Sequence, residues 1–284
     1  MAATTEKSFH VRSVSWPSQA HPTTLRVEEE LHKLRTCVAT SACSITNEMI
    51  CNGLKHLANL YEGIEDLLRL PSVQQGLLHL DQKRRLQEDV DGSLKLLDIC
   101  GSVKDAVNTS KVHVQDLQLA LRRRGENTTE EKIRAYIRSR KDMQKIIKKS
   151  CKDLKQVNDK CRSISLLEDS ELSVISRVLN EARTIIRSLL CSILQSMSMP
   201  KTKSSWWSFS SKAMRMVCDD SCEAWNVDVS LCRDLKVADA EKVTMVQIQL
   251  KTIENSFGDL ENGLECLFRR LIQNRVSLLN ILSL

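Results

Sequence analysis

The first residues of the chain contain a serine whose neighbours favour phosphorylation. Arg12 lies three residues before Ser15, while Ser13 and Pro17 stand on either side of it. A phosphate on Ser15 would add close to two negative charges and three acceptor oxygens, which an arginine cluster binds strongly. The pattern R-S-x-S-x-P is typical of phosphoserine sites read by 14-3-3 adaptor proteins. We therefore predict that Arg12, Ser13, Ser15 and Pro17 form a phosphorylation site, with a chance match in an unmodified tail as the alternative.

A second candidate site is a strongly basic stretch in the middle of the chain. Between Arg122 and Arg162 there are 15 Lys or Arg against 6 Asp or Glu, a net of +9, whereas the whole chain carries +6. A basic helix face could meet anionic lipid headgroups or an acidic partner, or it could be a solvated exterior. The absence of interleaved aromatic residues argues against nucleic acid. The residues of this predicted docking face are Arg134, Arg138, Lys141, Lys145, Lys148, Lys149, Lys152 and Lys155.

Aromatic residues gather in one segment that is otherwise rich in Ser and Lys. Trp206, Trp207 and Phe209 lie between Lys203 and Lys212. This mixture is found at lipid interfaces, where an indole ring enters the apolar layer and its N–H stays in water. The same three rings could instead cover the end of a helical bundle, so both interpretations are kept.

Residues suited to catalysis or metal binding are scattered. The chain has 11 Cys and 6 His, and the histidines all precede residue 114 while most cysteines follow it. Cys218 and Cys222 lie one helical turn apart, but nothing nearby completes a metal site. There is no glycine-rich phosphate loop and no G-x-S-x-G motif. We predict a protein without catalytic activity, metal or cofactor, and keep a cysteine nucleophile as the weakest alternative.

The composition indicates the fold class. Only 8 Gly and 4 Pro occur in 284 residues, about a third of the roughly 12% that is usual. Turn-rich sandwiches, barrels and propellers are therefore excluded, and we predict an all-α, elongated helical bundle with a core of Leu, Ile, Val, Met and Cys.

The same composition bears on location. No apolar run approaches the roughly 18 residues that span a bilayer, and the odd number of scattered cysteines is typical of reduced thiols. We expect a cytoplasmic protein that could also bind a membrane peripherally. Residues 7–27 lack acidic side chains, so an organelle transit peptide is a minority alternative.

Periodicity and turn residues divide the chain into four parts. Residues 1–23 read as a flexible arm, 24–199 as a helical bundle, 200–212 as a linker, and 213–284 as C-terminal helices that complete the bundle. Within the bundle, Thr24 is a predicted N-cap, residues 39–46 are a weak join between two helices, and Pro71 ends the second.

Later helix starts follow from local signals. A new helix is expected near Asp81, and Thr128 followed by Glu131 forms a capping box that predicts a further start. Ser165 with Glu168 repeats the box, and Pro200 stops the helix that follows it.

The C-terminal segment has the most regular pattern. Apolar residues recur at alternating steps of three and four over five heptads, which predicts a long heptad-patterned helix or helical hairpin. The flanking positions carry few charges, so packing within the bundle is favoured over a parallel dimer, although self-association stays open. The positions are Val243, Val246, Leu250, Ile253, Phe257, Leu260, Leu264, Leu267, Leu271, Asn274, Leu278 and Ile281.

Four blocks in order resemble one family. They are residues 8–13 with the serines and prolines that follow, residues 70–75, residues 91–100, and residues 260–282, which include Glu265-Cys266-Leu267-Phe268-Arg269-Arg270. Together they resemble the plant-specific BYPASS-like family, plant domain of unknown function 241. The resemblance implies a helical plant protein with a family-level link to root and shoot development. It implies no catalytic activity and supplies no active-site residues.

These observations combine into one expected function. We expect a non-enzymatic interaction or scaffold protein that binds protein partners and is regulated through its N-terminal arm. The alternative is a peripheral membrane protein that docks on anionic lipid through the basic helix and the aromatic loop.

Overall fold

A computed structural model describes residues 21–40, 46–77, 80–123, 126–158, 171–197 and 240–284. These residues form seven helices and no strand, so the predicted all-α class is confirmed. The helices are α1 (Pro22–Thr40), α2 (Asn47–Leu68), α3 (Pro71–Leu77), α4 (Leu80–Arg123), α5 (Glu126–Asn158), α6 (Glu171–Ser196) and α8 (Ala240–Leu282).

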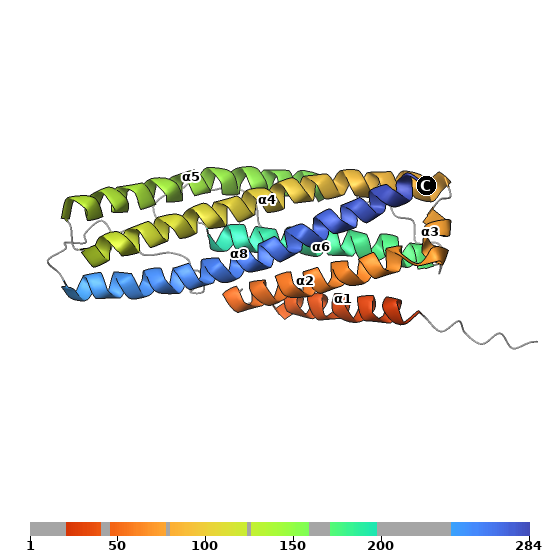
Figure 1. The fold of residues 1–284 in the computed structure, drawn as a ribbon, viewed down its shortest axis with the longest axis horizontal. Coiled ribbons are helices and arrows are strands. Elements are labelled where there is room, and N and C mark those ends of the chain that lie inside the picture. The colour runs from red at the N-terminus through yellow and green to blue at the C-terminus, as the bar shows by residue number, and fades with distance from the viewer. Residues whose placement is uncertain (1–20, 41–45, 78–79, 124–125, 159–170, 198–239) are drawn as a thin grey trace, which may run out of the picture.

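The helices other than the short α3 lie side by side along one axis, which makes the bundle elongated (Figure 1). With 44 and 43 residues, α4 and α8 are each about 65 Å long, because a helix rises about 1.5 Å per residue. α4 packs against α8 and α5, α2 packs against α8 and α1, and α6 contacts α1, α2, α4 and α5. α4 and α8 therefore form the spine on which the other helices are placed.

α8 is one unbroken helix, and its predicted apolar seam is buried along its whole length. Asn274, the polar position of the seam, is also buried at 3% exposure. The seam packs on α4 and α2 within the same chain, which confirms packing within the bundle. Because the seam is used inside the monomer, a second copy would have to bind another face of α8.

Polar pairs along the edge of the seam set the antiparallel alignment of α4 and α8. The Lys104 Nζ lies 2.8 Å from Glu265 Oε2, and the Lys111 Nζ lies 2.7 Å from Glu261 Oε2. The Gln115 side-chain amide donates to Glu254 Oε1 at 2.9 Å. The α4 residue number rises as the α8 residue number falls along this series, so the two helices run in opposite directions.

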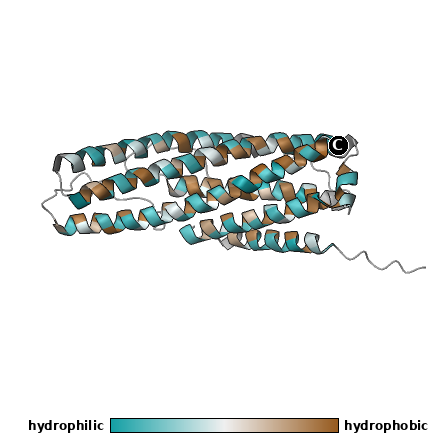
Figure 2. Cartoon of the chain, in the orientation of Figure 1, coloured by the Kyte–Doolittle hydropathy of each residue, from teal (hydrophilic) through white to brown (hydrophobic). Residues whose placement is uncertain are grey.

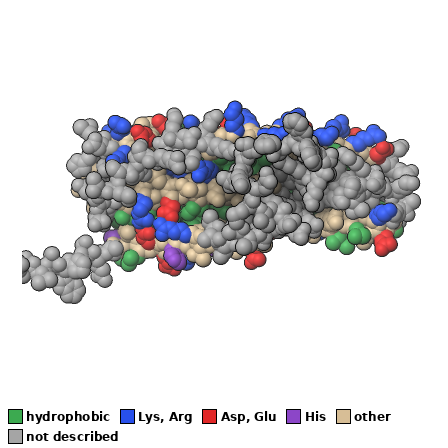
Figure 3. All heavy atoms as spheres, turned by 180° about the vertical axis from the view of Figure 1, so that it is seen from behind, with side chains coloured by type: hydrophobic (Ala, Val, Ile, Leu, Met, Phe, Trp, Pro, Cys, Tyr) green, Lys and Arg blue, Asp and Glu red, His purple; other side chains and the backbone are tan. Residues whose placement is uncertain are grey.

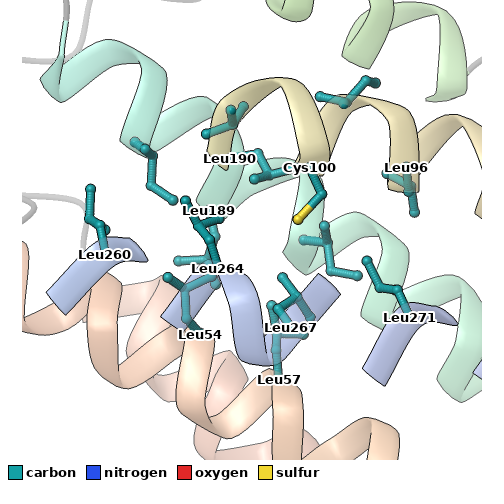
Figure 4. Packing of buried hydrophobic residues seen from close by; sticks show 14 of the residues in the cluster. Leu54, Leu57, Leu96, Cys100, Leu189, Leu190, Leu260, Leu264, Leu267 and Leu271 are labelled. Atoms are coloured by element: carbon teal, nitrogen blue, oxygen red, sulfur yellow. The ribbon is translucent and has the colours of Figure 1, made fainter. Parts of the chain in front are cut away.

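The core is built mainly from leucine. Figure 4 shows Leu54 and Leu57 of α2, Leu264 and Leu267 of α8, and Cys100 of α4 converging between the helices. Hydrophobic and hydrophilic residues alternate along the helices in Figure 2, the pattern of amphipathic helices around a shared core. The expected aliphatic core with a buried cysteine is confirmed.

Two predicted helix starts are wrong by a few residues. α1 begins at Pro22, so Thr24 lies inside the helix and is not its cap; proline suits a first helical position because its missing N–H needs no partner there. α5 begins at Glu126, two residues before the expected start at Thr128. Thr129 contributes instead to the α4–α5 corner, where its hydroxyl donates to the Ala120 carbonyl at 3.4 Å.

The other boundaries within the described residues agree with the sequence. α1 and α2 flank the predicted join at 39–46, α2 ends at Leu68 before Pro71, and α4 begins at Leu80, next to Asp81. Several predicted features lie outside the described residues: residues 1–20, Ser165 and Glu168, Pro200, and the linker at 200–212.

Candidate functional site: the basic row on α5

α5 is amphipathic, and its apolar side holds it on α4. Five apolar side chains at helical spacing are buried, and they pack in the shared core. Because this face is fixed against the longest helix of the bundle, the opposite face of α5 is presented to solvent on a rigid support. The buried apolar residues are Ile133, Tyr136, Met143, Ile147 and Leu154.

The opposite face of α5 carries a continuous row of cations, which we call the basic row. Its members follow each other at steps of three and four, and from Arg134 to Lys152 the row covers about 27 Å of helix. Lys149 lies beside it, and Lys155 follows in the same helix, although its side chain is outside those described. Lys and Arg gather along the upper edge of Figure 3, where α5 runs. The exposed members are Arg134, Arg138, Lys141, Lys145, Lys148 and Lys152.

Two members of the row are paired with acids of their own helix. The Arg134 guanidinium donates to Glu130 at 2.6 Å, and Lys145 donates to Asp142 at 2.8 Å. The hydrogen bond from Lys145 lowers the pKa of Asp142. For Arg138, Lys141, Lys148, Lys149 and Lys152, no ion pair is formed with any described residue.

Next to the basic row, α4 and α5 enclose a groove of about 570 Å³ whose lining includes four aspartates. Asp98 and Asp105 line it from α4, while Asp142 and Asp153 line it from α5, together with Lys149. The sign of the surface charge therefore changes across α5, from the basic row to the acidic groove. This boundary was not among the sequence-based predictions, although the seven-residue spacing of Asp98 and Asp105 places both on one face of a helix and was a signal for it.

One arginine of the basic stretch is not part of the outer face. Arg140 is buried at 3% exposure, and burial lowers the pKa of its guanidinium. It lies three and four residues from Met143 and Tyr136, which are both in the core. The charge count over residues 122–162 thus overstates the exposed basic charge by at least this residue.

Two of the described cysteines, Cys100 and Cys51, have the properties of structural thiols. Burial raises the pKa of Cys100 to about 12 and that of Cys51 to about 11, so both are thiols at neutral pH. No group of three His, Cys, Asp or Glu among the described residues could hold a metal ion. Cys218 and Cys222 lie outside the described residues.

No helix of the described part of the chain is long and apolar enough to cross a membrane. The predicted phosphorylation site at Arg12, Ser13, Ser15 and Pro17 lies outside the described residues. So do the aromatic residues Trp206, Trp207 and Phe209. Of the three candidate sites read from the sequence, the structure therefore places only the basic row.

The fold and the row together define the class of protein: an elongated all-α bundle with a charged outer helix. The family model described as Protein BPS1 matches residues 53–281, which include α5 and the whole basic row. The chain belongs to the BPS1 family, as its resemblance to BYPASS-like plant proteins indicated. No curated protein and no solved structure shows a significant match to it.

Proposed function

We propose that this protein is a non-enzymatic interaction protein in plant development, and that the basic row on α5 is its docking surface for an acidic protein partner. Membership of the BPS1 family suggests the developmental role, and this family is not a known enzyme family. The observation that carries the docking surface is the set of exposed cations on α5 that pair with no described acid.

The rigidity of the row supports binding. α5 is fixed along α4 by its buried face, so the spacing of the cations is set before a partner arrives and little ordering of the backbone is needed. A row of like charges also raises the rate of encounter with an oppositely charged surface and repels basic proteins. An acidic helix or an acidic extended segment would match its length.

Regulation through the N-terminal arm is part of the proposal. It rests on the R-S-x-S-x-P pattern around Ser15, which a basic-directed kinase and a 14-3-3 adaptor would each recognise. The arm and the basic row would then serve different partners, one regulatory and one constitutive.

The test compares full-length protein with a variant in which Arg138, Lys141, Lys148 and Lys152 are each replaced by Glu. The control reverses four exposed cations on α2 and α4 instead: Lys55, Arg85, Lys95 and Arg122. Proteins recovered from plant extract are quantified by mass spectrometry. We expect the wild type and the control to recover acidic partners that the row variant does not recover. Added salt should release these partners, because exposed charges are screened beyond about 8 Å already at physiological ionic strength.

The same variants test the membrane alternative. Full-length protein is floated with phosphatidylcholine vesicles that contain or lack phosphatidylserine. One result would contradict the proposed protein partner: the wild type floats only with the anionic vesicles, the row variant does not float, and the row variant still recovers every protein partner. The basic row would then be a lipid-binding face.

A further inference from the structure

A second groove lies at the end of the bundle where α8 ends. It has a volume of about 610 Å³ and is formed by the last turn of α2, by α3 and by the last three turns of α8. Its floor is apolar and closed, since Leu68 and Ile281 are 1% and 3% exposed.

The sides of this groove expose apolar side chains that the bundle leaves uncovered. Ile272, Val276 and Leu284 are 42%, 49% and 73% exposed, and all three line the groove. Gln273, Ser277 and Asn280 lie among them and offer amide and hydroxyl groups. An extended peptide could bury its side chains against the first set and hydrogen-bond its backbone to the second.

The groove is close to the point where the N-terminal arm joins the bundle. α1 begins at Pro22, and Arg26 in its first turns forms an ion pair with Asp66 of α2. Glu65, the residue before Asp66, lines the groove. Figure 1 shows the start of α1 and the end of α8 at the same end of the bundle.

The arm has the residues to fill such a groove. Phe9 and Val11 are two residues apart, as are Val14 and Trp16, so in an extended chain each pair points to one side. Five residues separate Trp16 from Pro22 and can span about 17 Å at roughly 3.4 Å per residue. The groove extends about 18 Å along α8 from residue 272 to 284, at about 1.5 Å per residue, which is comparable to the span of these five residues.

We propose that residues 9–16 of the N-terminal arm bind in this groove, with Val14 and Trp16 packed against Ile272, Val276 and Leu284. Ser15 is then part of the bound segment, and an adaptor that reads its phosphate competes with the groove. This inference does not depend on the basic row. The unphosphorylated arm would then bind to the helical bundle of its own chain.

The experiment measures hydrogen exchange of residues 1–20 in the full-length protein. The groove variant carries Ile272→Glu and Val276→Glu. The control carries Met245→Glu and Ile248→Glu, two positions on the same helix that are 52% and 63% exposed and lie outside the groove. We expect amides of residues 9–16 to exchange about tenfold more slowly in the wild type than in a free peptide of the same sequence. The groove variant should lose this protection, and the control should keep it.

Two results would overturn the proposal. One is exchange of residues 9–16 in the wild type at the rate of the free peptide. The other is protection of residues 272–284 that rises with protein concentration while the arm stays unprotected, which would make a second copy the occupant of the groove. Unchanged exchange in α4 of both variants shows that the bundle has remained folded.

Discussion

Arg183 on α6 and Asp89 on α4 form an ion pair inside the bundle, where their side chains are 9% and 13% exposed. Burial raises the pKa of Asp89, and the nearby Arg183 acts against that rise. Burial raises the pKa of Tyr61 of α2, and both charges of the pair lie close enough to act on it. The pair therefore links α6 to α4 within the core.

The first prediction concerns this pair. Replacing Asp89 by Asn, or Arg183 by Met, should lower the free energy of unfolding by about 3 kcal/mol, because the remaining charge loses its buried counter-charge. The double variant Asp89→Asn with Arg183→Met should lose less than either single variant, since no uncompensated charge is left. Urea unfolding of the four proteins checks both statements. Additive losses would show that the two charges do not interact.

The second prediction concerns the packing of α1 against α2. A Cβ on Gly63 would lie 2.7 Å from Val27 Cγ2, closer than side chains pack. Gly63→Leu should push α1 away and destabilise the protein by about 1–3 kcal/mol through overpacking, with faster amide exchange over residues 22–40.

A matched glycine provides the control for this variant. In α8, a Cβ on Gly258 would meet only Lys111 Nζ at 4.0 Å. Gly258→Ala should stabilise the protein by about 1 kcal/mol, the difference in helix propensity between the two residues. If both variants changed stability in the same direction, the contact with Val27 would not be the cause.

The third prediction is a pH dependence at the α4–α8 contact. Hydrogen bonds from Lys104 and Arg269 lower the pKa of Glu265 below 4.5, and those from Gln115 and Lys251 lower the pKa of Glu254. A carboxylate with a lowered pKa in the folded state stabilises the protein above its unfolded pKa and loses this effect as the pH falls through the folded value. The free-energy difference between wild type and Glu254→Gln/Glu265→Gln should therefore shrink as the pH falls below 4.5. Comparison with the variant removes the opposite contribution of Asp89. A difference that grew in acid would contradict the assigned hydrogen bonds.

The fourth prediction concerns the polar position of the α8 seam. Asn274 is 3% exposed, and its Nδ2 has no hydrogen-bond partner among the described residues. Asn274→Leu should raise the free energy of unfolding by about 1–2 kcal/mol, because a buried donor is replaced by an apolar group. Leu271→Ala, one turn earlier, should lower it by about 2–5 kcal/mol. Light scattering of both variants tests whether Asn274 also restrains self-association. A loss of stability with Leu would mean that the amide is satisfied in solution.

The contrast between α8 and the rest shows what a sequence can reveal. The α8 seam was predictable because its period stays regular over five heptads, and a period that regular specifies the buried face whatever packs on it. The start of α5 was not predicted correctly. Thr128 and Glu131 fit a capping box, but α5 begins earlier, at Glu126, and Thr129 bonds to the Ala120 carbonyl of α4.

The exposure of single residues was still harder to predict from the sequence. Ile272 and Val276 are apolar residues on the most regular helix of the chain, yet they are exposed because α2 and α4 cover only part of its circumference near the C-terminus. Arg140 shows the reverse case, a cation drawn into the core by its place on the buried side of α5. The exposure of Ile272 and Val276 and the burial of Arg140 all depend on which helices are neighbours. The residues near each position in the sequence do not specify those neighbours.

The last prediction separates the paired from the unpaired cations of the basic row. Arg134 and Lys145 already donate to Glu130 and Asp142, so part of their charge is neutralised before a partner binds. Glu130→Gln with Asp142→Asn should release both cations and tighten binding to a polyglutamate peptide several-fold at low salt, through a more positive row. The gain should disappear near 1 M salt, where charges are screened beyond about 3 Å. Glu48→Gln with Glu88→Gln, which changes net charge equally at exposed sites on other helices, is the matched control. Equal tightening in both variants would mean that net charge, and not the basic row, attracts the peptide.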